Sequence, residues 1–273
     1  METQIVLPNF YDISLVHMKG NLKKSEWNSI THSHDHFELS IHIKGNIQIF
    51  AENSSYLLSG GEIRLYGAGE LHCGIVRNEE EMEWYQINIP QSFLSAPNGT
   101  ELTRIFWDRK FGTKNVLHLQ KQKEIVSMLE SAFAMYCGGN PLALCLCQSI
   151  VVGILCLLGD SKGYFARDAV NKIPALEEIL DMIHTEYATI CTVADIARKT
   201  HFSVSYINKL FRAQVGVSPY QFLLEKKFIE AKKALKNGKS VTEAAEMAGF
   251  RDYSGFITLF KKRYGMTPYR YKN

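Results

Sequence analysis

The chain has 273 residues, of which 46% are hydrophobic and 22% are charged. At roughly 100–200 residues per domain, this length indicates one large domain or two ordinary ones. The composition supports a packed core, which excludes a disordered protein, a collagen-like repeat and a disulfide-stabilised miniprotein. The net charge of +3 divides unevenly, because residues 167–273 carry 18 basic and 11 acidic side chains whereas residues 1–166 carry 13 and 17. A basic half joined to an acidic half indicates that one end of the chain meets a polyanion.

The features that report on compartment predict a cytoplasmic protein. Residues 1–15 contain no basic segment followed by an apolar stretch, so we expect no secretory signal. The six cysteines show no CxxC motif and no regular spacing, which is typical of reduced thiols. Residues 142–158 are apolar apart from Gln148 and Ser149, but a bilayer span needs about 20 such residues. We therefore expect no membrane segment, and interpret this run as a helix that is buried on most sides.

Residues 1–116 have the pattern of a small β-barrel. Short strand-like segments recur every eight to twelve residues, separated by turn signals such as Gly45-Asn46 and Gly60-Gly61. Evenly spaced short strands are typical of a barrel or a sandwich. The clearest predicted strands are 38–44, 47–52, 62–66, 72–76 and 83–89.

The pattern becomes helical after residue 116. Residues 117–160 predict a pair of helices separated by Cys-Gly-Gly-Asn-Pro at 137–141. The second helix is apolar on most sides and therefore needs partners to cover it. Residues 161–172 are interpreted as a linker, because they combine Gly163 with mixed charges. The apolar face of the first predicted helix consists of Ile125, Met128, Leu129, Ala132 and Phe133.

Residues 173–273 contain a degenerate internal repeat. Shifting residues 204–222 by 49 positions places six identical residues of 253–271 in register, among them the Gly, Pro and Tyr of each copy. Each copy has the pattern of a short helix, a tight turn and a second helix. The expected N-caps are Thr192 and Ser203 in the first copy, and Ser240 or Thr242 and Asp252 in the second.

Two helix-turn-helix units would read DNA from one face. Such a unit places its second helix in the major groove, and two units about 34 Å apart meet adjacent turns of the groove. Residues 219–236 are predicted to form the long helix between them. The alternative is a helical bundle with two similar hairpins whose basic helices are only solvated.

The most specific pattern of the chain lies in the second copy. It comprises Ala248-Gly249-Phe250-Arg251-Asp252, Phe256, Phe260-Lys261-Lys262, Gly265 and Thr267-Pro268-Tyr269-Arg270. With these residues, 173–273 resembles the DNA-binding domain of the AraC/XylS family of bacterial transcription regulators. The chain departs from that family's pattern at Gly255, where an aromatic residue is common, and at Lys227, where arginine is usual. The resemblance also implies that 117–160 is the dimerisation segment.

The groove-facing residues follow from helix geometry and from this resemblance. Positions 205, 208, 209 and 212 lie at i, i+3, i+4 and i+7, on one helical face. Asn208 suits adenine edges, and basic side chains suit guanine or phosphate. The predicted DNA-binding residues are Ser205, Tyr206, Asn208, Lys209, Arg212, Tyr253, Ser254, Thr258, Lys261 and Lys262. The second set is chemically weaker, so we expect the first copy to discriminate more strongly among DNA sequences.

A histidine cluster marks the acidic half. In an extended strand, His32, His34, His36 and Glu38 project from one face, because side chains alternate with period 2. The intervening positions 37, 39, 41 and 43 are apolar. We therefore expect the polar face to line a pocket inside the barrel and the apolar face to pack under helices.

The spacing of this cluster, with His72, resembles the metal-binding motifs of the cupin superfamily. That resemblance implies His32, His34, Glu38 and His72 as ligands of one divalent transition metal, and imidazole and carboxylate suit such ions. Two alternatives stay open. The same residues with His36 form a metal-free pocket for a small-molecule effector, or they form a hydrogen-bonded network with a structural role alone.

The sequence thus predicts an α+β multidomain protein: a cupin-like barrel (1–116), a helical dimerisation segment (117–160), a linker (161–172) and a DNA-binding domain (173–273). The expected function is that of a sequence-specific transcription regulator, an activator controlled by a small molecule such as a sugar. Promoter DNA, the effector, RNA polymerase and a second copy of the chain are its expected partners. A metal-responsive regulator and a metal-dependent cupin enzyme are the alternatives, although we expect no enzymatic activity.

Overall fold

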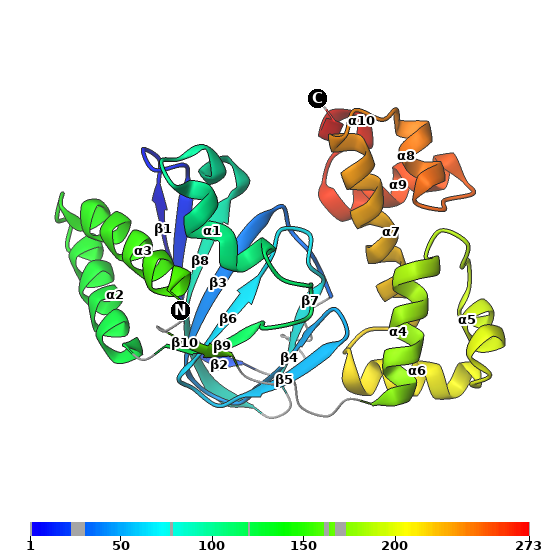
Figure 1. Ribbon diagram of the computed structural model, residues 1–273, viewed down its shortest axis with the longest axis horizontal. Helices are drawn as coiled ribbons and strands as arrows, with labels where there is room; N and C mark the ends of the chain where they lie inside the picture. The colour runs from blue at the N-terminus through cyan, green and yellow to red at the C-terminus, as the bar shows by residue number, and fades with distance from the viewer. Residues whose placement is uncertain are drawn as a thin grey trace. The chain divides into compact units, whose positions relative to one another are not determined.

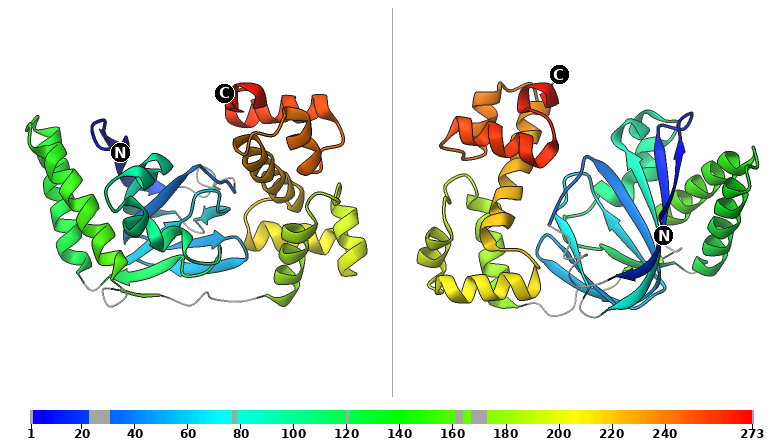
Figure 2. Two further views of the ribbon diagram at one scale, coloured as in Figure 1. Left: turned by 45° about the horizontal axis from the view of Figure 1, so that its top comes forward. Right: turned by 180° about the vertical axis from the view of Figure 1, so that it is seen from behind.

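The protein is described by a computed structural model covering residues 2–22, 31–76, 79–119, 121–160, 164–166 and 173–272. The chain divides into two compact units (Figure 1, Figure 2). The first unit comprises residues 1–29 and 34–171, and the second comprises 30–33 and 172–273. The first is rich in strands and the second is helical, which confirms the predicted α+β fold class.

The first unit is built on two antiparallel sheets. The larger sheet has the strand order β1-β2-β8-β3-β6-β9-β10, and the smaller has the order β5-β4-β7. The five strands named from the sequence correspond to β3, β4, β6, β7 and β8, whereas β1, β2, β5, β9 and β10 were not named individually. The strands are β1 (Glu2–Leu7), β2 (Ile13–Leu22), β3 (His36–Lys44), β4 (Ile47–Ala51), β5 (Ser54–Leu58), β6 (Glu62–Tyr66), β7 (His72–Ile75), β8 (Glu80–Pro90), β9 (Val116–Leu119) and β10 (Tyr164–Ala166).

One face of the larger sheet is apolar and lies under helices. Phe37, Leu39 and Ile41 of β3 belong to a buried cluster that includes Phe106 and Leu129 of the helical layer. This arrangement confirms that the apolar face of β3 packs under helices, as period-2 alternation predicts. The helical elements of the unit are η1 (Gln91–Ser95), α1 (Gly99–Trp107), α2 (Gln122–Cys137) and α3 (Ala143–Gly159).

The other face of the larger sheet is turned toward the smaller sheet. Ile49 of β4 and Tyr56 of β5 form one buried cluster with Trp84 of β8, so side chains of both sheets meet in the barrel interior. From β3, the side chains on this inner face are those of Glu38, Ser40 and His42, all of them buried. The interior is therefore apolar in one part and polar in another.

The predicted boundaries of the helical segment and linker were wrong in one respect. β9 and β10 are antiparallel neighbours, with Leu117 paired to Ala166 and Leu119 to Tyr164. The segment 161–172 therefore includes a strand of the barrel, and a boundary at residue 116 divides the barrel at β9. A three-residue strand is too short to show periodicity, so its pairing depends on the rest of the sheet. The remainder of the predicted linker, 161–163 and 167–172, lies outside the described residues.

The second unit consists of helices, and three of the predicted N-cap residues form side-chain capping bonds. Thr192 and Ser240 each form a capping box, with Asp195 and Glu243 respectively, and Ser203 accepts a hydrogen bond from the backbone N–H three residues on. Asp252 occupies its predicted N-cap position but makes no side-chain capping bond. The helices are α4 (Pro174–Glu186), α5 (Val193–Thr200), α6 (Val204–Gln214), α7 (Pro219–Lys236), α8 (Val241–Met247), α9 (Tyr253–Tyr264) and α10 (Pro268–Lys272).

Helix α7 joins the cores of the two helix-turn-helix units. Its Phe222 packs edge-on against Phe211 of α6, with ring centroids 5.8 Å apart. Two turns further on, Phe228 packs against Phe260 of α9 at 5.9 Å. The predicted long helix thus supplies an aromatic side chain to each core. No helix in the described part of the chain is both long and apolar enough to span a bilayer.

Candidate DNA-binding and effector sites

The exposed face of α6 carries the first predicted DNA-binding set. Ser205, Tyr206, Lys209 and Arg212 are exposed, and Asn208 is half-buried. The side-chain amide of Asn208 donates a hydrogen bond to the backbone carbonyl of Val204 at 2.9 Å. That bond holds the amide against its own helix, so contact with a base edge requires one rotamer change.

The exposed face of α9 carries the second set. Tyr253, Ser254, Thr258, Lys261 and Lys262 are all exposed. The hydroxyl of Thr258 donates to the carbonyl of Ser254 at 3.0 Å, which occupies its single donor within the helix. The α9 set therefore has fewer available donors than the α6 set, and the expected difference in sequence discrimination stays a prediction.

Arg263, which follows these two lysines, is only partly exposed. Its guanidinium pairs with Glu225 of α7, a side chain that is largely buried. Burial raises the pKa of Glu225 and the charge and hydrogen bond of Arg263 act against that rise. Arg263 therefore ties α9 to α7, whereas Lys261 and Lys262 remain exposed.

The two helix-turn-helix units meet at Gly249. Its backbone has φ of +75°, and a Cβ at this position would lie 2.2 Å from the carbonyl oxygen of Ala188, so only glycine fits. Lys227 of α7 donates to the carbonyl of Gly249 at 2.8 Å, while burial lowers the pKa of this lysine. The lysine that replaces the family's usual arginine therefore still fastens the end of α8 to α7.

In the barrel, Glu38 is the centre of the predicted histidine cluster. Its carboxylate accepts hydrogen bonds from Ser40 at 3.1 Å and from the amide of Gln86 at 3.2 Å, and it lies 3.1 Å from Nε2 of His34. Nε2 of His72 lies 3.9 Å from the same carboxylate. Burial by itself raises the pKa of Glu38, but the hydrogen bond with His34 and the charges of His72, His34 and Arg64 outweigh it and lower the pKa. Glu38 is thus held as a buried carboxylate.

The histidines around Glu38 differ in geometry. The rings of His34 and His36 are stacked, 3.7 Å apart and within 7° of parallel, whereas His34 and His72 meet at 69°. Burial and then the charge of His34 lower the pKa of His36 to about 4. Contrary to the expectation of one extended strand, His32 and His34 precede β3, and residues 30–33 group with the second unit.

The donor set fits a divalent transition metal in chemistry and in tautomer. His72 faces the carbonyl of Glu70 through Nδ1 at 2.9 Å, so Nε2 carries the lone pair that is turned toward Glu38. Both ring nitrogens of His34 face oxygen atoms, Nδ1 the carbonyl of His36 at 2.9 Å and Nε2 the carboxylate of Glu38 at 3.1 Å. Donor atoms of His34, His36 and Glu38 lie within 4.8 Å of one another, and Nε2 of His72 lies 3.9 Å from Glu38, so these are the residues that would hold the ion.

A polar row across three neighbouring strands was not found by sequence reasoning. Ser40 of β3 pairs with Arg64 of β6 on one side and with Gln86 of β8 on the other. The amide of Gln86 also donates to Asn88 at 2.9 Å, and Asn88 donates to Ser14 of β2 at 3.1 Å. Alternation within each strand showed which residues share a face, but only the pairing register reveals that these faces meet beside Glu38.

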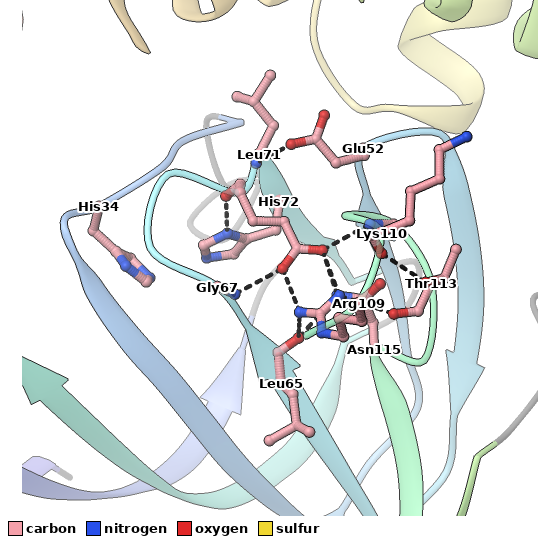
Figure 3. Close-up of polar contacts among 12 residues, drawn as sticks. His34, Glu52, Leu65, Gly67, Leu71, His72, Arg109, Lys110, Thr113 and Asn115 are labelled. Carbon is pink, nitrogen blue, oxygen red and sulfur yellow. Dashed lines mark hydrogen bonds and ion pairs between the residues drawn. The ribbon is translucent and has the colours of Figure 1, made fainter. Parts of the chain in front are cut away.

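Glu70 and Arg109 form a separate buried network (Figure 3). The Arg109 guanidinium donates to both oxygens of Glu70, and the backbone N–H groups of Gly67 and Gly112 donate to the same carboxylate at 2.7 and 2.8 Å. The amide of Asn115 adds a further bond at 2.8 Å. Glu70 is therefore fully engaged in holding loops to β6, and its chemistry is that of a structural support.

Comparison with known proteins identifies both units. Residues 23–110 match the family model of the AraC-like ligand binding domain, and residues 196–273 match that of a helix-turn-helix domain. The chain belongs to the AraC family of transcriptional regulators. The predicted DNA-binding regulator with an N-terminal ligand-binding domain is thereby confirmed, and the residue-level assignments stay predictions.

Relatives of this AraC-family chain include regulators of sugar operons. A probable transcriptional regulator LumQ of Photobacterium leiognathi is 24% identical over 242 residues, 88% of this chain and 91% of that protein. The raffinose operon transcriptional regulatory protein RafR of Pediococcus pentosaceus is 28% identical over 134 residues, 46% of this chain and 48% of its own length. A solved structure of ToxT from Vibrio cholerae is 15% identical, covering 94% and 96% of the two chains with a TM-score of 0.38.

Proposed function

We propose that this regulator activates transcription when a small polyhydroxylated molecule, such as a sugar, occupies the barrel. The observation that carries the proposal is the polar row from Ser14 to Arg64, which places amide, hydroxyl and guanidinium groups in the polar part of the barrel interior. Amides and hydroxyls of this kind suit a ligand rich in hydroxyl groups. The name of one relative, a raffinose operon regulatory protein, supports the same ligand class.

The ligand would act by shifting a conformational equilibrium. A molecule that binds one arrangement of the chain better than another stabilises that arrangement by the difference in its two affinities. The arrangement that is favoured with ligand bound would present α6 and α9 to promoter DNA and recruit RNA polymerase. A regulator of transcription works beside the chromosome, so we place it in the cytoplasm, and we propose no catalytic role for the barrel.

A second copy of the chain is the partner that we propose for the helical pair. Leu142 at the start of α3 is 64% exposed, and Met128 and Tyr136 of α2 are exposed as well. Exposed large apolar side chains on neighbouring helices are typical of interfaces between subunits. Analytical ultracentrifugation of the wild-type protein and of Leu142→Glu tests this, with a dimer expected for the first and a shift toward monomer for the second.

DNA binding is tested by its salt dependence and by two variants. An operator is first selected from a random duplex library, and affinity is then measured by fluorescence anisotropy at several salt concentrations. The logarithm of the association constant should fall by about 0.9 per neutralised phosphate for each unit of log salt. Lys262→Ala should reduce this slope by about 1, whereas Asn208→Ala should leave it unchanged and cost about 1–3 kcal/mol at one base position. A flat salt dependence would contradict the proposed mode of binding.

A resident divalent transition metal is a second, separate proposal. The observation that favours it is His34, whose two ring nitrogens both face acceptors. When bound, the ion would supply a positive charge between His34, His72 and Glu38. Elemental analysis of untagged protein tests it: about one metal per chain is expected, and less in His34→Ala and His72→Ala. His17→Ala, which removes a histidine paired with Glu83 outside the cluster, is the matched control.

A further inference from the structure

Arg64 is a buried cation inside the barrel without a partner of its own. The residue is only 6% exposed and lies in β6, opposite Ser40 of β3. Its guanidinium stands over the ring of Trp84 at 5.9 Å, and its Nε is buried with no hydrogen-bond acceptor. Among the residues that the structure describes, no carboxylate lies within ion-pairing distance of this guanidinium.

The neighbouring carboxylate does not supply the missing partner. Glu38 shares the inner face and feels the charge of Arg64, but its oxygens are occupied by Ser40, Gln86 and His34. The other deeply buried arginine shows the opposite situation. Arg109 donates to both oxygens of Glu70, which has no exposed surface at all. Arg109 therefore has a resident counterion, and Arg64 does not.

An unpaired buried charge is costly, and proteins avoid it by supplying a partner. The planar guanidinium is also the group best shaped to bind a carboxylate or a phosphate through two parallel hydrogen bonds. We infer that the ligand of the barrel carries an oxyanion, a carboxylate or a phosphate, that pairs with Arg64. This inference rests on the proposed function, because it names the chemical class of the ligand for the same site.

The rest of the row indicates what is attached to the oxyanion. Gln86 lies two strands from Arg64, across Ser40, and neighbouring strands are about 4.8 Å apart, so the two residues are separated by about 10 Å. Gln86 and Asn88 carry amides that bond to hydroxyl groups as readily as to one another. A sugar acid or a sugar phosphate has the length and both kinds of group that this row would bind.

Thermal unfolding of the full-length protein tests the inference. All three tryptophans (27, 84 and 107) lie in the first unit, so tryptophan fluorescence follows the barrel alone. Wild type, Arg64→Met, Arg64→Lys and the exposed control Arg104→Met are heated with EDTA in chloride, phosphate or acetate at equal ionic strength. Galactose, galacturonate and galactose 6-phosphate follow as a matched set, in which the acid and the phosphate distinguish the two kinds of oxyanion.

The expected result is an oxyanion effect that depends on the charge at position 64. At ten times its Kd, an oxyanion should raise the melting temperature of wild type and Arg104→Met by about 3 °C more than chloride does. Arg64→Met should lose this increment in melting temperature, and Arg64→Lys should keep part of it. In chloride, Arg64→Met should melt at a temperature no lower than that of wild type. The inference is overturned if the increment is equal in wild type and Arg64→Met. It is also overturned if wild type shows no increment.

DNA binding separates this inference from the proposed function. If neutral galactose changes operator affinity equally in wild type and Arg64→Met, the regulator responds to a small molecule but the anionic ligand is wrong. If the oxyanion increment depends on Arg64 while none of the six probes alters operator affinity, the anion site stands and the effector proposal fails.

Discussion

Replacing either member of the Glu70–Arg109 pair should destabilise the barrel, and the two replacements should differ in size. Removing one partner of a buried ion pair costs about 3–5 kcal/mol, because the other charge is left uncompensated. After Arg109→Met, Glu70 keeps three donors, from Gly67, Gly112 and Asn115. We therefore expect the lower end of this range, about 3 kcal/mol.

Glu70→Leu should cost more, because it also removes the acceptor of those three donors. Each orphaned buried donor adds about 1–3 kcal/mol, so the total reaches about 6 kcal/mol or more. That amount is comparable with the whole stability of a domain, typically about 5–15 kcal/mol. Glu70→Leu should therefore leave the barrel partly or wholly unfolded at room temperature.

Urea denaturation followed by tryptophan fluorescence measures these effects in the barrel alone. Arg104→Met is the control, because Arg104 is exposed and its ion pair with Glu101 should contribute less than about 1 kcal/mol. Equal midpoints for Glu70→Leu and Arg109→Met would refute the role assigned to the three additional donors. A midpoint of Arg109→Met that matched the control would refute the role assigned to the ion pair.

Three further predictions concern single side chains. Burial, with the charge of Arg64, lowers the pKa of His42 to about 4, so the unfolded chain binds a proton below pH 6.5 that the folded chain does not. His42 should therefore lower the free energy of unfolding by up to about 3 kcal/mol as pH falls from 6.5 to 4. In urea titrations repeated at each pH, the free energy of unfolding of His42→Gln should fall less steeply with decreasing pH. Gly249→Ala should destabilise the second unit by about 2 kcal/mol or more, through backbone strain and collision with Ala188. Its melting temperature, followed by circular dichroism, should fall; an unchanged temperature would argue against the close approach of Gly249 to Ala188. Thr192→Ala should lower the stability of the second unit by about 1 kcal/mol, whereas Thr192→Ser should restore it.

The helical unit was largely predictable because its signals are local. Three helices are capped by side chains that bond to backbone groups within three residues: Thr192, Ser203 and Ser240. Each of these helix starts can therefore be predicted from a short stretch of sequence. The repeat then fixed where the second copy had to begin. The pairing of Arg263 with Glu225 was not predictable, because Glu225 lies 38 positions away on α7 and no local pattern indicates such a contact.

The barrel was less predictable because its contacts are between distant strands. The inner face of β3 followed from alternation, yet Arg64 and Gln86 join Glu38 only through the register with β6 and β8. Helix α1 begins at Gly99, and its N-cap Asn98 is in the left-handed conformation and makes no side-chain capping bond, so this start departs from the usual pattern. The expected strand through His32 and His34 failed because regular pairing of β3 begins only at His36.

The pairing of β9 with β10 gives the helices between them an unusual relation to the barrel. Residues 119 and 164 are direct neighbours across the sheet, so α2 and α3 together form a long insertion in a β-hairpin. Both ends of the insertion are anchored at one sheet edge, and a distortion of that edge moves the two ends together. The position of an interface formed by these helices would therefore depend directly on the sheet that would enclose the ligand.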